Sequence, residues 1–283
     1  NIAMHFVQAR GILSQNNGMN IYRGCSHGCI YCDSRSKCYG FTHAFEDIEV
    51  KENAPELLEQ ALRSKRHKCM IGTGAMCDPY LPAEKELQLT RKCLKLIDRY
   101  EYGVTVLTKS NLVLRDLDLL QSIHKKTKAV VQMTLTTYDE DLCRKLEPNV
   151  STTRERFEVL MRCKESGIPT LVWMTPILPF INDTRENIEG LLNYCLQAGV
   201  QGILVFDVGV TLREGDREYF YQALDRDFPG IRQKYVSTYG NAYDIPSPHA
   251  KELMTLIQNT CTANGMLCSP KECFTYLHEF PER

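Results

Sequence analysis

Short apolar runs alternate with longer amphipathic runs along most of this chain, and no other feature constrains its fold as strongly. Six apolar runs predict strands, at Met19–Tyr22, Cys69–Thr73, Gly103–Leu107, Ala129–Leu135, Pro169–Met174 and Gly202–Phe206. Five amphipathic runs between them predict helices, at Pro55–Arg66, Glu84–Tyr100, Arg115–His124, Thr152–Ser166 and Arg185–Ala198. Strands that alternate with helices pair in parallel through right-handed crossovers, which leave the helices outside. We therefore expect an α/β protein, a partial (β/α)6 TIM-like barrel with parallel strands.

The barrel is expected to span residues 4–210, and a C-terminal helical extension over residues 211–283 is expected to pack on it. We expect Asn1–Ala3, which precede Met4, to be a remnant of a cloning vector. A chain of 283 residues with 43% hydrophobic residues can bury a core of this size. Its formal charge of −1 provides no general attraction for nucleic acid, so a polynucleotide would need a local basic patch.

Three cysteines, Cys25, Cys29 and Cys32, follow the first predicted strand with the spacing C-x3-C-x2-C. Gly24 and Gly28 let the backbone turn closely enough for the three sulfurs to face one site. Loops at the carboxyl ends of strands build the sites of parallel barrels, so this position suits a reactive centre. Three thiolates can hold a cubane iron–sulfur cluster with one iron open, whereas a structural metal site closes its shell with a fourth ligand.

A structural zinc site is the alternative interpretation of this loop. His27, Asp33 and Cys38 stand near enough in the sequence to supply a fourth ligand. His27 would strain the loop, and Cys38 would reach the metal only if the chain turned back. Zinc modules usually carry two paired knuckles, and this loop has one triplet. The competing function is therefore a non-catalytic zinc- or nucleic-acid-binding module that uses the same cysteines.

The triplet, with an aromatic residue directly before its last cysteine, resembles the cluster loop of the radical S-adenosylmethionine enzymes. The longer run from Asn20 to Cys32 resembles the subgroup of spore photoproduct lyase and its relatives labelled DNA-repair photolyases. Five later segments follow in the family's order: Gly74-Ala75-Met76-Cys77-Asp78-Pro79, Leu107-Thr108-Lys109, Met133-Thr134-Leu135-Thr136, Leu146-Glu147-Pro148 and Thr175-Pro176-Ile177. The resemblance covers roughly residues 18 to 210, and its cluster motif is the most specific part.

The resemblance implies a [4Fe-4S] cluster on the three loop cysteines and S-adenosylmethionine as the second cofactor. It implies a lyase- or repair-like enzyme that cleaves this ligand reductively to methionine and a 5′-deoxyadenosyl radical, which abstracts hydrogen from a substrate. A flavodoxin- or ferredoxin-like protein would donate the electron. The substrate is unidentified, and a nucleic-acid lesion or a modified base is one option.

The resemblance also assigns the residues that contact the adenosyl ligand: Tyr31, Gly74, Ala75, Cys77, Lys109, Thr134, Thr136 and Thr175. Gly74 and Ala75 would receive the methionine end, and Lys109 would pair with its carboxylate. Thr134 and Thr136 are expected to share one face of the fourth strand, where a hydroxyl can bond the ribose. Threonine is also an ordinary strand residue, so a purely structural role remains an alternative.

Two departures from spore photoproduct lyase concern its substrate. The lyase uses a cysteine to return hydrogen to its product radical, and Ala75 stands at that position here. Cys77, two residues on, is the expected catalytic substitute because alternation can place it on the same face. The segment from Ser237 to Pro246 lacks clear similarity to the lyase's lesion-binding hairpin. Both departures weigh against thymine-dimer repair.

Thirteen cysteines with irregular spacing predict free thiols in a reducing compartment, the cytoplasm. No long apolar run predicts a membrane span, and we expect a monomer. Cys261, Cys268 and Cys273 match no compact ligand set, so a second cluster and simple packing both remain open.

Arg35, Lys37 and Arg213 are the cations best placed for an anionic substrate. The basic runs before the predicted strands lie at the opposite end of the barrel from the expected site.

Overall fold

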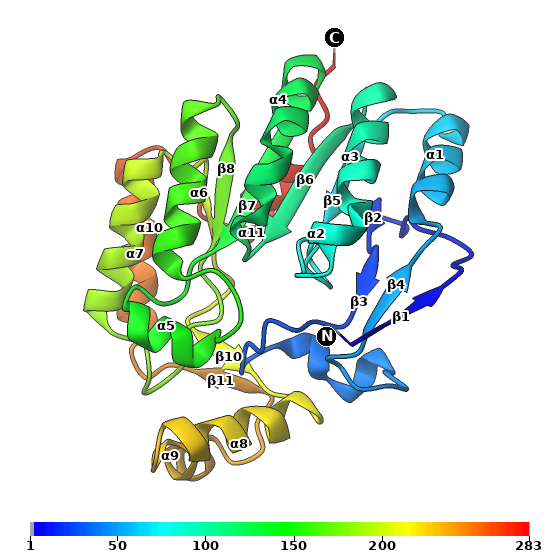
Figure 1. The fold of residues 1–283 in the computed structure, drawn as a ribbon. Helices are drawn as coiled ribbons and strands as arrows, with labels where there is room; N and C mark the ends of the chain where they lie inside the picture. Colours follow the sequence, from blue (N-terminus) through cyan, green and yellow to red (C-terminus); the bar gives the residue numbers. More distant parts are fainter. Residues whose placement is uncertain (1–2, 283) are drawn as a thin grey trace.

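The computed structural model describes residues 3–282 and has a six-stranded parallel sheet at its centre (Figure 1). Asn1 and Ile2 of the expected vector remnant lie outside the described residues. The strand order is β2 (Gly18–Met19), β5 (Met70–Thr73), β6 (Gly103–Thr108), β7 (Ala129–Thr134), β8 (Thr170–Trp173) and β9 (Ile203–Leu204). Each neighbouring pair is parallel, so the predicted parallel α/β sheet is confirmed.

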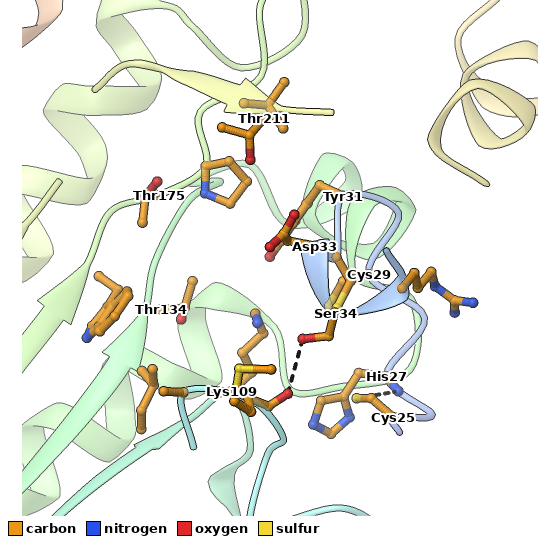
Figure 2. Close-up of a pocket in the computed structure, with 18 of the residues that line it drawn as sticks. Cys25, His27, Cys29, Tyr31, Asp33, Ser34, Lys109, Thr134, Thr175 and Thr211 are labelled. Atoms are coloured by element: carbon orange, nitrogen blue, oxygen red, sulfur yellow. Dashed lines mark hydrogen bonds between the residues drawn. The ribbon is translucent and has the colours of Figure 1, made fainter. Parts of the chain in front are cut away.

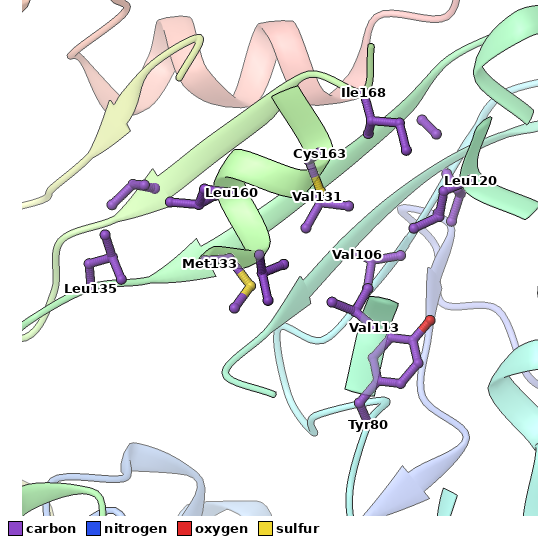
Figure 3. Packing of buried hydrophobic residues seen from close by; sticks show 14 of the residues in the cluster. Tyr80, Val106, Val113, Leu120, Val131, Met133, Leu135, Leu160, Cys163 and Ile168 are labelled. Atoms are coloured by element: carbon purple, nitrogen blue, oxygen red, sulfur yellow. The ribbon is translucent and has the colours of Figure 1, made fainter. Parts of the chain in front are cut away.

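The helices that connect these strands lie mainly on the outer face of the sheet, as the right-handed crossover rule requires (Figure 1). They are α1 (Ala54–Ser64), α2 (Glu84–Leu87), α3 (Leu89–Arg99), α4 (Leu117–Lys126), α6 (Thr153–Glu165) and α7 (Arg185–Ala198). The short helix α5 (Glu140–Leu146) instead packs against the cysteine loop at the carboxyl ends of the strands. A 3-10 turn, η3 (Asn111–Asp116), leads into α4. Val106, Val131 and Met133 from the sheet pack against Leu120 and Leu160 from the helices to form the main core (Figure 3).

Two predicted elements are divided in the structure. Met19–Tyr22 is split between β2 and β3 (Tyr22–Arg23), which belong to different sheets. The helix predicted over Glu84–Tyr100 breaks at Gln88, whose φ of 51° is left-handed. The buried carboxylate of Glu84 accepts hydrogen bonds from the Tyr22 hydroxyl at 2.6 Å and the Thr90 amide at 2.8 Å. This carboxylate satisfies an amide at the start of α3, so the break leaves that donor paired.

Most of the remaining elements surround the carboxyl ends of the central strands. A small sheet combines β1 (Met4–Val7), β4 (Ile48–Lys51) and β3, and two 3-10 turns, η1 (Asp33–Arg35) and η2 (Lys37–Tyr39), follow the cysteine loop. After β9 come β10 (Gly209–Thr211), α8 (Asp216–Asp227), α9 (Ile231–Tyr239), β11 (Asp244–Pro246), α10 (Ala250–Ala263) and α11 (Pro270–His278). By contrast, helix α10 packs against α7, and α11 packs against β9. Strands β10 and β11 form an antiparallel pair. In Figure 1 this pair and the blue N-terminal loops lie at the end toward which the central strands point.

No helix within residues 3–282 is both long enough and apolar enough to span a membrane.

Candidate metal centre and cofactor cavity

The cysteine loop between β3 and η1 forms one wall of a cavity of about 670 Å³ at the carboxyl ends of the central strands. Cys29 is buried, and Cys25 and Cys32 are half-buried. Figure 2 shows Cys25 and Cys29 on the side of the cavity opposite Thr134 and Thr175. All thirteen cysteines are free thiols, as predicted.

Two glycines give the loop its path. Gly24 and Gly28 have φ values of 96° and 74°, which a side chain would strain. A Cβ on Gly24 would lie 2.5 Å from the Phe45 carbonyl oxygen, so another residue would push the loop off this segment. The Cys25 amide donates to that same carbonyl at 3.1 Å.

The spacing of the three sulfurs distinguishes a single ion from a larger cluster. A tetrahedral zinc ion with bonds of about 2.3 Å holds its sulfurs about 3.8 Å apart. Among residues 3–282, the only three His, Cys, Asp or Glu residues whose ligand atoms all lie within 4.8 Å are His5, His43 and Asp47, beside the small sheet. The three loop sulfurs are therefore not gathered within 4.8 Å of one another, as a single tetrahedral ion would require.

The groups considered as a fourth zinc ligand are bonded elsewhere. His27 Nε2 lies 2.9 Å from Asp78 Oδ2. Cys38 donates to Ser36 at 3.3 Å, and Asp33 accepts from the Tyr39 hydroxyl at 3.0 Å. His27 Nδ1 and Asp33 Oδ1 have no hydrogen-bond partner among the described residues. The three cysteines line the cavity, and within residues 3–282 no fourth His, Cys, Asp or Glu atom is gathered with their sulfurs within 4.8 Å.

Asp78 is the anchor that ties the cysteine loop to the strands. Besides His27, it accepts hydrogen bonds from the Thr108 hydroxyl at 2.7 Å and the Lys109 amide at 2.9 Å. Burial alone would raise the pKa of Asp78, but these donors and His27 hold it at about 2. The carboxylate therefore stays charged and fixes the loop over the ends of β5 and β6.

A buried set of charges lies below the loop. The Tyr31 hydroxyl donates to Glu147, and Glu147 pairs with Arg156 at 3.0 Å, both side chains being fully buried. The Lys109 ammonium lies 5.8 Å from the centre of the Tyr31 ring. Burial lowers the pKa of Lys109, but Cys29 and Glu147 outweigh this effect and raise it above its usual value. A permanent positive charge therefore lies beside the thiols.

Gly74 brings the backbone close to β6. Its φ is 106°, and a Cβ there would lie 1.8 Å from the Leu107 carbonyl oxygen, so no side chain fits. Gly74, Ala75 and Cys77 all line the cavity. Burial is the main cause that raises the pKa of Cys77 to about 12, and the Gly24 amide donates to its sulfur. The thiol is therefore protonated at neutral pH.

The predicted threonines do not all reach the cavity. Thr134, the last residue of β7, and Thr175 line it. Thr136 does not: it lies beyond the strand, is completely buried, and shares a 3.1 Å hydrogen bond with the Thr137 hydroxyl. Strand alternation ends before it, so the expected shared face with Thr134 is wrong.

The three expected anion-binding cations are each paired with a carboxylate. Arg35 lines the cavity and bonds Glu46 at 2.5 Å, and its guanidinium lies 3.6 Å from the centre of the Tyr219 ring. Lys37 pairs with Glu214 at 2.7 Å, and Arg213 lies 3.8 Å from Asp33. Neither Lys37 nor Arg213 lines the cavity.

Several lining residues escaped the sequence interpretation. Trp173 and Phe206 lie in the cavity with Asp207, and β10 and β11 contribute one wall. Trp173 stands one residue before the end of the strand predicted over Pro169–Met174. Because it is the chain's single tryptophan, the sequence could have singled it out as a cavity residue. The hairpin carries no such signal, because its two strands are only three residues long.

The C-terminal cysteines lie away from this site, since none of them lines the cavity. Cys261 and Cys273 are buried, and Cys268 is half-buried. Cys261 and Cys268 are hydrogen-bonded to each other. A second cluster on these thiols stays a prediction.

Residues 19–195 match the radical SAM superfamily. An uncharacterized protein of Mycobacterium bovis is 29% identical over 249 residues, which cover 83% of this chain and 70% of the relative. An uncharacterized protein of Methanocaldococcus jannaschii is 34% identical over 169 residues, which cover 59% of this chain and 62% of the relative.

Solved structures resemble the fold. Spore photoproduct lyase complexed with dinucleoside spore photoproduct has a TM-score of 0.67 at 13% sequence identity, and the match covers 94% of this chain and 81% of the lyase chain. Streptococcus suis SuiB bound to precursor peptide SuiA has a TM-score of 0.55 at 14% identity, and the match covers 89% of this chain and 47% of the SuiB chain. These identities support likeness of fold, while the family match spans more than half of the chain. The chain belongs to the radical SAM superfamily and is an enzyme whose cofactors are a [4Fe-4S] cluster and S-adenosylmethionine.

Proposed function

We propose that Cys25, Cys29 and Cys32 hold the [4Fe-4S] cluster and that the adjoining cavity receives S-adenosylmethionine. One observation carries this proposal: the three loop cysteines line one cavity, and within residues 3–282 their sulfurs are not gathered within 4.8 Å of one another or of a fourth ligand atom, as a closed single-ion site would require. Such a donor set suits a cubane and leaves one iron for a ligand from the cavity.

The chain's own residues would then bind and orient the ligand. Lys109 offers a half-buried positive charge to its carboxylate, and Gly74 lets the backbone approach its methionine end. Tyr31, Ala75, Thr134 and Thr175 line the same cavity, where the threonine hydroxyls can bond ribose oxygens. Thr136 is left out because it is buried elsewhere.

When bound together, the two cofactors supply a 5′-deoxyadenosyl radical that abstracts hydrogen from the substrate. Cys77 is the proposed donor that returns a hydrogen atom. Its raised pKa keeps the S–H bond intact at neutral pH, and an intact thiol is what hydrogen-atom donation requires. The sulfur radical left on Cys77 by this step would return to the thiol by taking one electron from the electron-donor protein and one proton from solvent, which reaches the cavity, where Phe206 is 55% exposed.

The substrate class supported by the fold likeness is a modified base or a nucleic-acid lesion, since that lyase was solved with a dinucleoside. A flavodoxin- or ferredoxin-like protein is the proposed electron donor. Arg35, Lys37 and Arg213 are each paired with a carboxylate, so they attract the sugar–phosphate backbone of a nucleic acid only weakly near the cavity.

The test compares wild type with Cys29→Ala and with Cys38→Ala, a nearby thiol outside the proposed ligand set. Each protein is reconstituted anaerobically and treated with dithionite and S-adenosylmethionine, and 5′-deoxyadenosine is measured by chromatography. We expect nucleoside from wild type and Cys38→Ala, and neither nucleoside nor a full iron complement from Cys29→Ala. Equal nucleoside from Cys29→Ala, or a wild-type protein that holds zinc and makes none, would contradict the proposal.

A further inference from the structure

The central strands separate two cores, one outside and one inside the curved sheet. On β7, Val131 and Met133 face the helices, whereas Val130 belongs to an inner cluster. On β8 and β9, Leu171 and Leu204 belong to that inner cluster as well. Side chains alternate along a strand, so Trp173, two residues after Leu171 on β8, also points inward. Phe206 lies beyond the end of β9 and lines the cavity beside it.

Helix α11 closes the inner side below the cavity. Cys273 and Leu277 from this helix pack into the inner cluster, and Cys273 approaches the carbonyl of Ile203 on β9. Phe274, on the same helix, lies 6.1 Å from both Trp173 and Phe206, measured between ring centres. The cavity therefore has an aromatic floor supported by α11.

The two floor rings differ in how tightly they are held. The Trp173 indole N–H donates to the Gln132 amide oxygen at 2.6 Å, which fixes the ring plane. Phe206 contacts Trp173 edge to face at 6.1 Å and is 55% exposed, the most exposed large apolar side chain within residues 3–282. A ligand that covered this exposed ring would bury apolar surface that the free protein leaves in contact with water.

The charges around this floor argue against an anionic ligand group. Asp207 follows Phe206 directly, and Asp33 and Asp244 also line the cavity. The lining cations are Arg35, paired with Glu46, and Lys109, half-buried beside Tyr31 of the cysteine loop. Both cations belong to the cysteine-loop side of the cavity, whereas a phosphate at the aromatic floor would meet the Asp207 carboxylate.

From these observations we propose that Trp173 and Phe206 form a stacking subsite for an uncharged planar aromatic ring of the substrate. The inference rests on the proposed function, since it takes this cavity as the place where substrate meets the adenosyl ligand. Offset or edge-to-face packing of rings provides the affinity, and the carboxylates select against phosphates near the ring.

Trp173 is the only tryptophan of the chain, so its fluorescence reports on this site alone. The reconstituted enzyme, saturated with S-adenosylmethionine and kept without reductant, is titrated with four probes. Thymidine and N-acetylphenylalaninamide carry an uncharged ring, N-acetylcyclohexylalaninamide is the matched probe without one, and a thymidine decanucleotide adds phosphates. Phe206→Leu keeps apolar volume but removes the ring, and Phe6→Leu is the control at a distant exposed phenylalanine.

We expect saturable quenching by at least one of the two ring probes, and which one binds identifies a nucleobase or an aromatic side chain as the source. Phe206→Leu should weaken that binding about five- to tenfold, and Phe6→Leu should leave it unchanged. The inference is overturned if no ring probe binds, if the cyclohexyl probe binds equally, if both variants behave alike, or if the decanucleotide binds more tightly than thymidine. A ring probe that binds only to enzyme free of S-adenosylmethionine, and not to the saturated enzyme, would also overturn it by assigning the floor to the cofactor.

Formation of 5′-deoxyadenosine separates this inference from the proposed function. If wild type and Phe206→Leu both make the nucleoside while no ring probe binds, only the stacking subsite fails. If neither makes it, the proposed function fails as well.

Discussion

Glu147 and Arg156 form an ion pair from which solvent is excluded, directly below the cysteine loop. The pair holds the Tyr31 hydroxyl, and the neighbouring Leu146 carbonyl accepts the Ile30 amide at 3.0 Å. Two links therefore connect the cluster loop to the end of α5. A buried ion pair of this kind stabilises a protein no more than well-packed apolar residues in its place would. Removal of one partner, however, leaves a buried charge without a counter-charge, which is strongly destabilising.

Glu147→Gln should lower the free energy of unfolding by about 3–5 kcal/mol, because Arg156 loses its counter-charge in a dry site. Chemical denaturation of the cluster-free protein measures this change. Glu158→Gln, which removes an exposed carboxylate from α6, is the matched control and should change stability by less than about 1 kcal/mol. A Glu147→Gln protein as stable as the control would contradict the role of the pair.

The sequence located the residues whose pattern is local and missed those whose role depends on burial. Cys25, Cys29 and Cys32 were identified because their spacing is contiguous. Arg156 was not, because an arginine in an amphipathic helix is usually solvated, and only the tertiary fold brings it to Glu147. Thr136 was misplaced because the end of β7 was not fixed by the sequence.

Among the secondary-structure elements, α6 shows how a local signal sets a boundary. Thr152 accepts the Glu155 amide at 3.3 Å, and Glu155 accepts the Thr152 amide at 2.9 Å. This reciprocal capping box begins the helix at Thr153, one residue after the predicted start at Thr152, which is the N-cap. The helix ends at Glu165, and Gly167 follows it with a φ of 73°.

Thr152→Ala should destabilise the protein by about 1 kcal/mol, because the substitution leaves a helical amide without its acceptor. Thermal unfolding compared with Thr42→Ala, a change at an exposed loop threonine, measures the effect. A shift no larger than that of the control would show that the cap contributes nothing.

The six central strands and the five helical connections between them were predictable because each has a distinct pattern of apolar residues and a clear boundary. The seven-residue α5 was not predicted, since it is too short to establish a helical period. Gln88 was missed because nothing local demands its left-handed φ. The buried Glu84 carboxylate, which bridges β3 and α3, favours this break through long-range contacts.

At the scale of the whole molecule, the segments after β9 return to the cluster loop. Helix α8 begins at Asp216, whose Oδ1 accepts the Arg213 amide at 2.7 Å, while its buried Oδ2 has no partner among the described residues. The Lys37 amide donates to the Glu214 carbonyl at 2.9 Å, which joins this segment to η2. The C-terminal segments therefore contribute to the stability of the region around the cysteine loop.

The unsatisfied carboxylate of Asp216 predicts a pH dependence of stability. Burial, the main cause, raises its pKa to about 6, above the ordinary value near 3.9. The folded state therefore binds the proton more tightly, and this stabilisation is complete below about pH 4 and lost as the pH rises through about 6. Asp216→Asn should stabilise the cluster-free protein at pH 7 by about 1–3 kcal/mol and have little effect at pH 4.

Denaturant titrations at the two pH values measure the effect of Asp216→Asn, with Asp225→Asn as the exposed control. The prediction fails if the substitution changes stability equally at both pH values, or if it destabilises at pH 7.

The most direct test of the central claim is electron paramagnetic resonance of the reconstituted, dithionite-reduced protein before and after addition of S-adenosylmethionine. The account predicts a [4Fe-4S] spectrum that changes on addition, because the ligand reaches the iron that no protein group occupies, and it predicts no such spectrum from Cys29→Ala. A cluster spectrum that the ligand leaves unchanged, or a colourless protein that retains zinc, would contradict it.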